Sequence, residues 1–116
     1  MNNPTSQPTI PSQPRSITLP SLSEKYAELL SGPPESVSMQ SGFVELLPGE
    51  SVGSHSTGDR EEMVVTISGK GEVTSPGMDP LPMHPGCVVY NPPQTVHNVV
   101  NSGDCPLRYI YIVARA

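Results

Sequence analysis

Short apolar runs separated by turn residues dominate the chain from residue 36 onward. Valine, isoleucine and other strand-forming side chains fill these runs, and each run is closed by residues such as glycine, proline, serine or aspartate, which favour tight turns. Runs of this length and spacing predict an all-β sandwich or small barrel. We expect strands at residues 36–40, 42–47, 63–68, 71–73, 87–90, 96–101 and 107–114.

The segment before this region has a different pattern. Ser21 and Glu24 have the spacing of a capping box, and apolar residues follow at near-helical intervals as far as Leu30. Gly32 and the two prolines after it would end such a helix. The pattern predicts one short N-terminal helix over residues 22–30. We therefore divide the chain into a flexible proline-rich tail at residues 1–15, an arm with the helix at 16–35, and the barrel at 36–116.

Composition narrows the possible functions. The chain of 116 residues holds 15 prolines, a net charge of −5 and 4% aromatic residues, so it lacks the basic face and stacking rings of a nucleic-acid-binding protein. No apolar run approaches the roughly 20 residues that cross a bilayer, and no secretory signal is present, so we expect a cytoplasmic protein that binds no membrane. Cys87 and Cys105 are expected to be free, buried thiols.

Two histidines and one glutamate stand where polar side chains are costly. Glu62 precedes the apolar run 63–67, and strand alternation places His97 on one face with Val99. His55 ends a polar stretch. If these side chains face inward, each needs a partner. Two imidazoles and one carboxylate that converge inside a barrel form a set that holds a divalent transition metal and leaves coordination positions open.

The spacing of these residues resembles the two sequence motifs of the cupin superfamily. The first motif is glycine, five residues, histidine, one residue, histidine, three or four residues, glutamate, six residues, glycine; it is matched by Gly49, His55, Glu62 and Gly69. The second is glycine, five residues, proline, one residue, glycine, two residues, histidine, three residues, asparagine; it is matched by Gly86, Pro92, His97 and Asn101. The resemblance covers residues 37–114 and implies a cupin double-stranded β-helix, or jelly-roll, barrel.

The resemblance also implies a metal site. Carried over position by position, it leaves His55, Glu62 and His97 as ligands of a divalent transition metal such as Ni, Zn, Mn or Fe. Thr57 replaces the second histidine of the first motif, and its hydroxyl could hold a metal-bound water or contact substrate. Glu61 is the alternative to Glu62, which is preferred because it stands six residues before the motif glycine. A barrel without metal stays open, because some cupins bind only organic molecules.

Several further side chains are candidates for contact with a substrate. Gln94 replaces the glycine of the second motif and is expected at the barrel mouth. Tyr90, Tyr109 and Tyr111 occupy strand faces, and one of these faces is expected to line the cavity. We interpret Arg60 as a solvated loop charge that could receive an anionic substrate at the mouth.

Two functions follow from these residues. The first is a small cupin enzyme that acts on a small polar or phenolic molecule at the metal, in an oxidoreductase (dioxygenase), isomerase or lyase reaction. The second is a non-catalytic module that binds a small ligand without metal; the missing histidine favours it, whereas the retained Glu62 favours the enzyme. We also expect a homodimer that covers exposed strand edges with the helix 22–30 or the strand 42–47.

Overall fold

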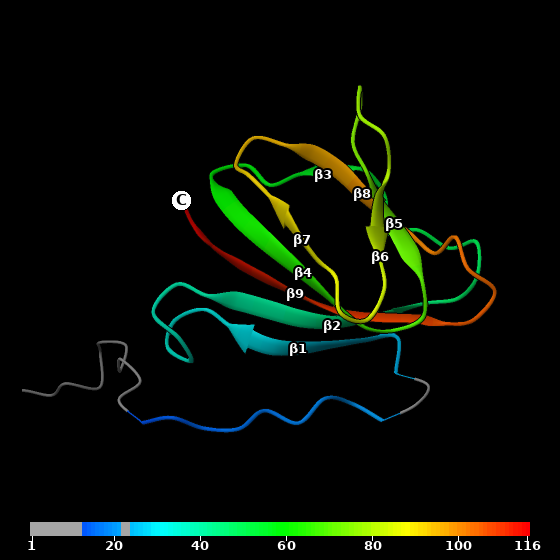
Figure 1. Cartoon of the computed structure of the whole chain (residues 1–116). Coiled ribbons are helices and arrows are strands. Elements are labelled where there is room, and N and C mark those ends of the chain that lie inside the picture. The colour runs from blue at the N-terminus through cyan, green and yellow to red at the C-terminus, as the bar shows by residue number, and fades with distance from the viewer. Residues whose placement is uncertain (1–12, 22–23) are drawn as a thin grey trace, which may run out of the picture.

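The chain folds into two antiparallel β-sheets that face each other and form a barrel (Figure 1). A computed structural model describes residues 13–21 and 24–116. In this part of the chain the larger sheet has the strand order β1-β2-β9-β4-β7 and the smaller sheet the order β3-β8-β5-β6. The strands are β1 (Tyr26–Ser31), β2 (Gln40–Leu46), β3 (His55–Ser56), β4 (Arg60–Ser68), β5 (Gly71–Thr74), β6 (Leu81–Met83), β7 (Val88–Asn91), β8 (Val96–Val100) and β9 (Leu107–Arg115).

Strand alternation separates an inner face from an outer face. In β4 the side chains of Glu62, Val64 and Thr66 are buried, whereas Met63 and Ile67, which point to the other face, are exposed. The inner faces of both sheets supply the hydrophobic core, which consists of Leu46, Val64, Val73, Met83, Val89, Val99, Leu107 and Tyr109. The predicted all-β jelly-roll barrel is therefore confirmed, and six of the expected runs form β2, β4, β5, β7, β8 and β9.

The predicted helix over residues 22–30 is wrong for the part that the structure describes. Residues 22 and 23 lie outside the described residues, and Tyr26–Ser31 form β1, an edge strand that pairs with β2. The register shifts between Glu28 and Leu30, as at a β-bulge. A bulge interrupts the alternation of side chains between the two faces of the sheet, so Leu29 and Leu30 are both partly buried. The resulting spacing of apolar residues resembles that of a helix.

The expected strand at residues 36–40 is also wrong for residues 36–39, which lie outside any strand, and only Gln40 belongs to β2. Ser36 donates its backbone N–H to the Gly32 carbonyl over 3.1 Å, and its hydroxyl donates to the Met39 carbonyl. The carboxylate of Glu35 accepts the N–H of Ser31 over 3.0 Å. These local hydrogen bonds satisfy the polar groups of the segment without a neighbouring strand.

The N-terminal arm runs along the outer side of β1 and β2 (Figure 1). Arg108 of β9 donates from Nη2 to the carbonyls of Pro20 and Ser21 at 2.9 and 3.1 Å, and its guanidinium carbon lies 4.6 Å from the ring centre of Phe43. Phe43 is consequently fully buried although it points away from the barrel core. The predicted tail at residues 1–15 lies outside the described residues as far as residue 12, so its flexibility stays a prediction.

Asn101 fixes the loop between β8 and β9. Its Nδ2 donates to the carbonyls of Leu46 and Cys105 at 2.9 and 2.8 Å, and its Oδ1 accepts the N–H of Gly103 at 2.9 Å. The motif glycine Gly69 has a positive φ of 86°, and a Cβ there would lie 2.3 Å from the Pro106 carbonyl oxygen of the same region. The second-motif asparagine and first-motif glycine are therefore packing requirements of one barrel end.

The two cysteines are free thiols, as expected. Cys87 is half-buried and Cys105 is exposed, so the expectation that both are buried is wrong. The described residues contain no helix long and apolar enough to cross a membrane.

Candidate metal and substrate site

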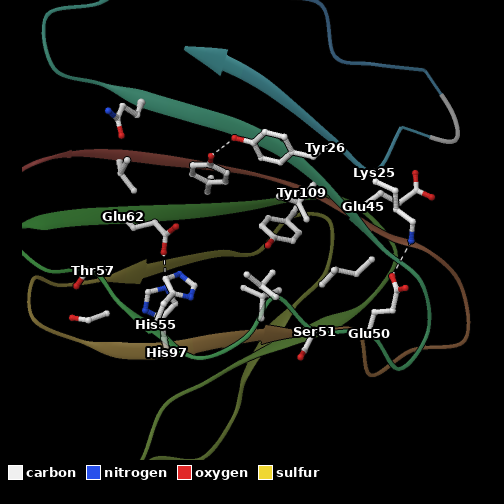
Figure 2. A pocket seen from close by; sticks show the side chains of 18 of the residues that line it. Lys25, Tyr26, Glu45, Glu50, Ser51, His55, Thr57, Glu62, His97 and Tyr109 are labelled. Atoms are coloured by element: carbon white, nitrogen blue, oxygen red, sulfur yellow. Dashed lines mark hydrogen bonds and ion pairs between the residues drawn. The ribbon is translucent and has the colours of Figure 1, made fainter. Parts of the chain in front are cut away.

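The inner faces of the two sheets enclose a cavity of about 850 Å³ (Figure 2). One end holds His55, His97 and Glu62, and the other holds Lys25 and Glu50. Tyr109 lies between the two ends. The lining residues are Lys25, Tyr26, Gln40, Val44, Glu45, Leu46, Glu50, Ser51, Val52, His55, Ser56, Thr57, Arg60, Glu62, His97, Val99, Tyr109, Tyr111 and Val113.

The structure brings the three predicted metal ligands together. His55 of β3 and His97 of β8 are direct cross-strand partners, and their ring centres lie 4.4 Å apart at an interplanar angle of 59°. Glu62 reaches His97 from β4 in the opposite sheet, with its Oε1 2.9 Å from Nε2 of His97. Residues far apart in the sequence thus meet because the two sheets face each other at this end of the barrel.

Backbone carbonyls fix the tautomer of both imidazoles. Nδ1 of His97 lies 3.0 Å from the Thr95 carbonyl oxygen, and Nδ1 of His55 lies 2.9 Å from that of Gly53. A carbonyl only accepts hydrogen bonds, so each Nδ1 carries the proton and each neutral ring keeps a lone pair on Nε2. This is the arrangement in which histidine binds a metal through Nε2.

Nε2 of His97 is the most constrained polar atom of the site. The side chain is 1% exposed, and this nitrogen has no hydrogen-bond partner of acceptable geometry although Oε1 of Glu62 is 2.9 Å away. A lone pair facing a carboxylate at that distance is repulsive. A cation shared by the two atoms, either a proton on Nε2 or a metal ion, removes the repulsion. The donor atoms therefore fit a divalent metal.

The described residues do not contain a preformed centre of three ligands. Within residues 13–21 and 24–116, no group of three or more His, Cys, Asp or Glu side chains is already placed to hold a metal ion. The buried pair His97 and Glu62 is close enough, whereas His55 joins it from an exposed position on the two-residue strand β3.

Asn91 orients the glutamate, and the sequence analysis missed it. Its Nδ2 donates to Oε1 of Glu62 over 3.0 Å, and the two residues are cross-strand partners on β7 and β4. Asn91 is buried, and a buried amide requires hydrogen-bond partners. The inward position of an asparagine at the end of the apolar run 87–90 was the available signal.

Glu61 and Tyr90 lie on the outer face of the larger sheet. Tyr90 is 54% exposed and donates its hydroxyl to Oε1 of Glu61 over 2.9 Å, a hydrogen bond that raises the pKa of Tyr90. The expectation that Tyr90 contacts substrate is therefore corrected, because alternation directs it away from the cavity. The same alternation directs Glu62, and not Glu61, inward.

Gln94 also lies outside the cavity lining. It adopts a left-handed backbone conformation with φ of 55°, the side chain is exposed, and its N–H donates to the Gly58 carbonyl over 2.8 Å. The motif position needs this conformation, which glycine adopts more readily than glutamine. The residue thus shapes the turn before β8, and the expectation that it contacts substrate is corrected.

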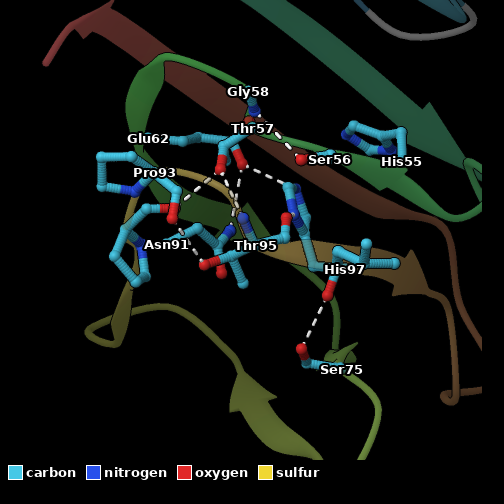
Figure 3. Close-up of polar contacts among 12 residues, drawn as sticks. His55, Ser56, Thr57, Gly58, Glu62, Ser75, Asn91, Pro93, Thr95 and His97 are labelled. Atoms are coloured by element: carbon cyan, nitrogen blue, oxygen red, sulfur yellow. Dashed lines mark hydrogen bonds and ion pairs between the residues drawn. The ribbon is translucent and has the colours of Figure 1, made fainter.

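Thr57 connects two loops in place of the missing histidine (Figure 3). Its hydroxyl donates to the Pro92 carbonyl over 2.7 Å and accepts the N–H of Thr95 over 3.0 Å. Thr57 lines the cavity, but these two hydrogen bonds occupy its hydroxyl proton and one lone pair. The β3–β4 connection is thereby fixed to the β7–β8 connection.

Tyr109 and Tyr111 line the cavity, as expected for one strand face of β9. Burial raises the pKa of Tyr109, and the nearby charge of Glu62 adds to the effect. Burial also raises the pKa of Tyr111, whose hydroxyl lies 2.7 Å from that of Tyr26. Both side chains therefore present neutral hydroxyl groups, which donate as well as accept hydrogen bonds.

A barrel of two facing antiparallel sheets, with two imidazoles and a carboxylate at one inner end, is the architecture that the sequence motifs anticipated. The model of the Cupin domain family matches residues 42–113. The chain therefore belongs to the cupin family.

Solved structures and a group of curated enzymes are similar to this chain. A Cupin 2 conserved barrel domain protein from Salinispora arenicola CNS-205 superimposes with a TM-score of 0.69 and 25% identity over 93% of this chain and 91% of that one. A cupin-like protein from Thermotoga maritima MSB8 gives a TM-score of 0.71 and 25% identity over 77% and 66%. Glucose-6-phosphate isomerase from Pyrococcus abyssi (strain GE5 / Orsay) is 44% identical over 62 residues, which are 50% of this chain and 33% of that enzyme.

Proposed function

We propose that this cupin is a metal-dependent isomerase that moves a proton on a small polar hydroxycarbonyl compound. The observation that carries the proposal is the pairing of Nε2 of buried His97 with the carboxylate of Glu62 at 2.9 Å, where a cation is required. His55, Glu62 and His97 would hold a divalent ion, for which Ni, Zn, Mn and Fe are all suitable. When bound, such an ion polarises a carbonyl or hydroxyl oxygen and acidifies the adjacent C–H.

The cavity supports this reaction through residues of the chain itself. Asn91 holds the carboxylate of Glu62 in place, and the Thr95 and Gly53 carbonyls hold the two imidazoles. Tyr109 makes no hydrogen bond through its hydroxyl to the rest of the described chain, so this group is free to donate to a substrate oxygen.

The curated relatives favour an isomerase over a dioxygenase or lyase. The matched isomerase from Pyrococcus abyssi aligns with this chain over 62 residues at 44% identity, and the alignment covers 33% of its length. Its activity therefore supports the reaction class proposed for this chain but does not identify the substrate. The cytoplasmic location also stays a prediction.

Metal content tests the proposal. The purified chain is incubated with each candidate metal, and excess metal is removed. The bound metal is then measured by inductively coupled plasma mass spectrometry. We expect about one ion per chain in the wild type and loss of most of it in His97→Ala and Glu62→Gln. His84→Ala is the matched control, because His84 is exposed in the turn before β7 and lies outside the cavity lining.

Activity is then measured as interconversion of glucose 6-phosphate and fructose 6-phosphate by the metal-loaded protein, as a first probe of the reaction class. Activity that follows metal content across the variants would support the isomerase. A wild-type chain that takes up none of the metals would refute it.

A metal-free binding module is the second candidate function. The specific observation in its favour is that a proton on His97 would complete its contact with Glu62 without any metal. This module would bind a small ligand in the cavity with unchanged affinity after chelator treatment, whereas the isomerase would lose its activity.

A further inference from the structure

The charged side chains that line the cavity are nearly all paired. Nζ of Lys25 lies 3.0 Å from Oε1 of Glu50, and Oε1 of Glu45 lies 3.6 Å from Nε of Arg108. Glu62 faces His97. Among the charged lining residues of the described chain, Arg60 is the one with no oppositely charged side chain within 4.0 Å. The guanidinium of Arg60 is therefore a positive charge at the cavity with no carboxylate side chain beside it.

Arg60 is placed and oriented for contact with a bound molecule. It is the first residue of β4 and lies two residues before Glu62, so alternation directs both side chains to the inner face. Two residues of a strand span about 7 Å, and both Arg60 and Glu62 line the same cavity. Arg60 is exposed, as expected, but it lies in β4 and not in a loop.

Gln40 and Arg115 make the guanidinium a better site for an anion. Oε1 of Gln40 accepts a hydrogen bond from Nη1 of Arg60, which orients the planar group and leaves its other N–H donors available. Arg115 is the cross-strand partner of Arg60, so a second positive charge stands beside it on β9. Like charges in such a pair repel, and an anion between the sheet end and the cavity offsets the repulsion.

We infer that Arg60, oriented by Gln40, binds the oxyanion of the substrate, a phosphate or a carboxylate. A guanidinium presents paired N–H donors that match two oxygens of such a group. The inference rests on the proposed function in one respect: the substrate is an anionic hydroxycarbonyl compound whose carbonyl end lies at His55, His97 and Glu62. The net charge of the chain is −5, so attraction of an anion to this cavity must come from a local positive group.

Anion titration of metal-free protein tests the inference. Inorganic phosphate and acetate are titrated separately and binding is followed by calorimetry, so the two arms distinguish a phosphate from a carboxylate site. We expect Arg60→Gln to lower the affinity for the preferred anion by about tenfold or more, and Arg60→Lys to lower it less. Gln40→Ala should give an intermediate loss, because the guanidinium remains but is no longer oriented.

The charge-matched control is Lys70→Gln. Lys70 is exposed in the turn between β4 and β5, outside the cavity lining, and its loss changes the net charge by the same amount. Binding should be unchanged in this variant. Circular dichroism of each variant excludes loss of folding as the cause of weaker binding.

Three results would overturn the inference: no saturable binding of either anion to the wild type, equal affinity in Arg60→Gln, or an equal loss in Lys70→Gln. The metal content of Arg60→Gln distinguishes failure of the anion-site inference from failure of the proposed metal-dependent function. If the Arg60→Gln variant binds metal normally but no longer binds the anion, the result supports the anion site at Arg60. A chain that never binds metal, yet loses the anion with Arg60, refutes the isomerase and leaves the anion site intact.

Discussion

At the scale of single residues, proton positions decide what the two histidines can do. Nδ1 of each histidine donates a hydrogen bond to a backbone carbonyl, so Nε2 of each neutral ring carries a lone pair. His97 is buried and faces Glu62, whereas His55 is exposed on β3. The difference in burial makes His97 the more demanding of the two, because its unpartnered nitrogen cannot be solvated.

Asn91 is expected to act on the metal through Glu62. Asn91→Leu removes the N–H donor that holds the carboxylate 3.0 Å away, so metal affinity should fall by about 10–100-fold. Competition with a coloured chelator measures the affinity. Gln94→Ala removes an exposed amide outside the cavity and should leave the affinity unchanged. Equal affinities in Asn91→Leu and the wild type would show that Glu62 needs no such support.

The buried tyrosine of β9 gives a pH dependence of stability. The pKa of Tyr109 is raised above its ordinary value of 10.0, so the folded protein retains this proton at pH values where the unfolded chain loses it. The stabilisation is fully present below pH 10.0 and declines as the pH rises above that value. At about pH 11 the loss from this group is about 1.4 kcal/mol.

Urea unfolding at about pH 8 and about pH 11 measures this effect. Tyr109→Phe should lose less unfolding free energy between the two pH values than the wild type does. Tyr90→Phe is the control on the exposed outer face. An equal loss in Tyr109→Phe and the wild type would contradict the assignment of the effect to this hydroxyl.

The sequence motifs predicted which polar residues of the metal site meet, but not the hydrogen bonds around them. His55, Glu62 and His97 have spacings that strand pairing brings together. Asn91 was missed because its role depends on the register between β4 and β7, which the sequence does not specify. The motif aligned Thr57 with a ligand, whereas its hydroxyl binds two backbone groups whose positions depend on loop conformation.

At the scale of secondary-structure elements, the structure departs from the sequence pattern in two places, once through strand pairing and once through local hydrogen bonds. The capping-box and apolar spacing of residues 21–30 favour a helix, but residues 26–31 gain an open edge of β2 as a partner. The run 36–40 has a strand-like pattern, but its polar groups are satisfied within the turn. The six central strands were predictable because their apolar runs pack against one another in any barrel of this kind.

The pairing of β2 with β9 depends on a small residue at one position. Gly42 is the cross-strand partner of Tyr111, and a Cβ at Gly42 would lie 2.6 Å from the tyrosine ring. Gly42→Ala should therefore displace the ring, break the Tyr26–Tyr111 hydrogen bond and destabilise the protein by about 1–3 kcal/mol.

A double-mutant cycle with Tyr111→Ala measures this contact by urea unfolding. The cost of Gly42→Ala should largely vanish when the ring is absent, because the added methyl group then has space. A cost that persists in the Tyr111→Ala background would show that the backbone conformation of Gly42, and not the ring, requires glycine.

At the scale of the whole molecule, the expected homodimer stays a prediction, and the structure changes the description of both surfaces predicted for it. Residues 26–31 form a strand and not a helix face, and β2 is paired on both edges, with β1 and with β9. The free edges of the larger sheet are β1 and β7. Exposed apolar side chains gather on the outer face at β7, where Val88 and Tyr90 lie beside Met63 of β4.

A second copy of the chain is a suitable partner for the β7 edge, because an antiparallel strand edge is self-complementary about a two-fold axis. Light scattering should then give twice the chain mass of 12.3 kDa. Val88→Lys should shift the mass toward that of one chain. Val37→Lys, which changes an exposed valine in the turn before β2, should leave the mass unchanged. A strictly monomeric wild type would contradict the expected dimer.

The brace formed by Thr57 has a consequence for any attempt to rebuild a fourth ligand. The hydroxyl ties the start of β4 to the approach of β8, the strand that carries His97. Histidine at this position would add a nitrogen donor for a metal ion but would remove both hydrogen bonds of the hydroxyl. We therefore expect a higher metal affinity together with greater mobility of the two loops. In this barrel, a contact between two loops occupies the position at which the first cupin motif carries a second histidine.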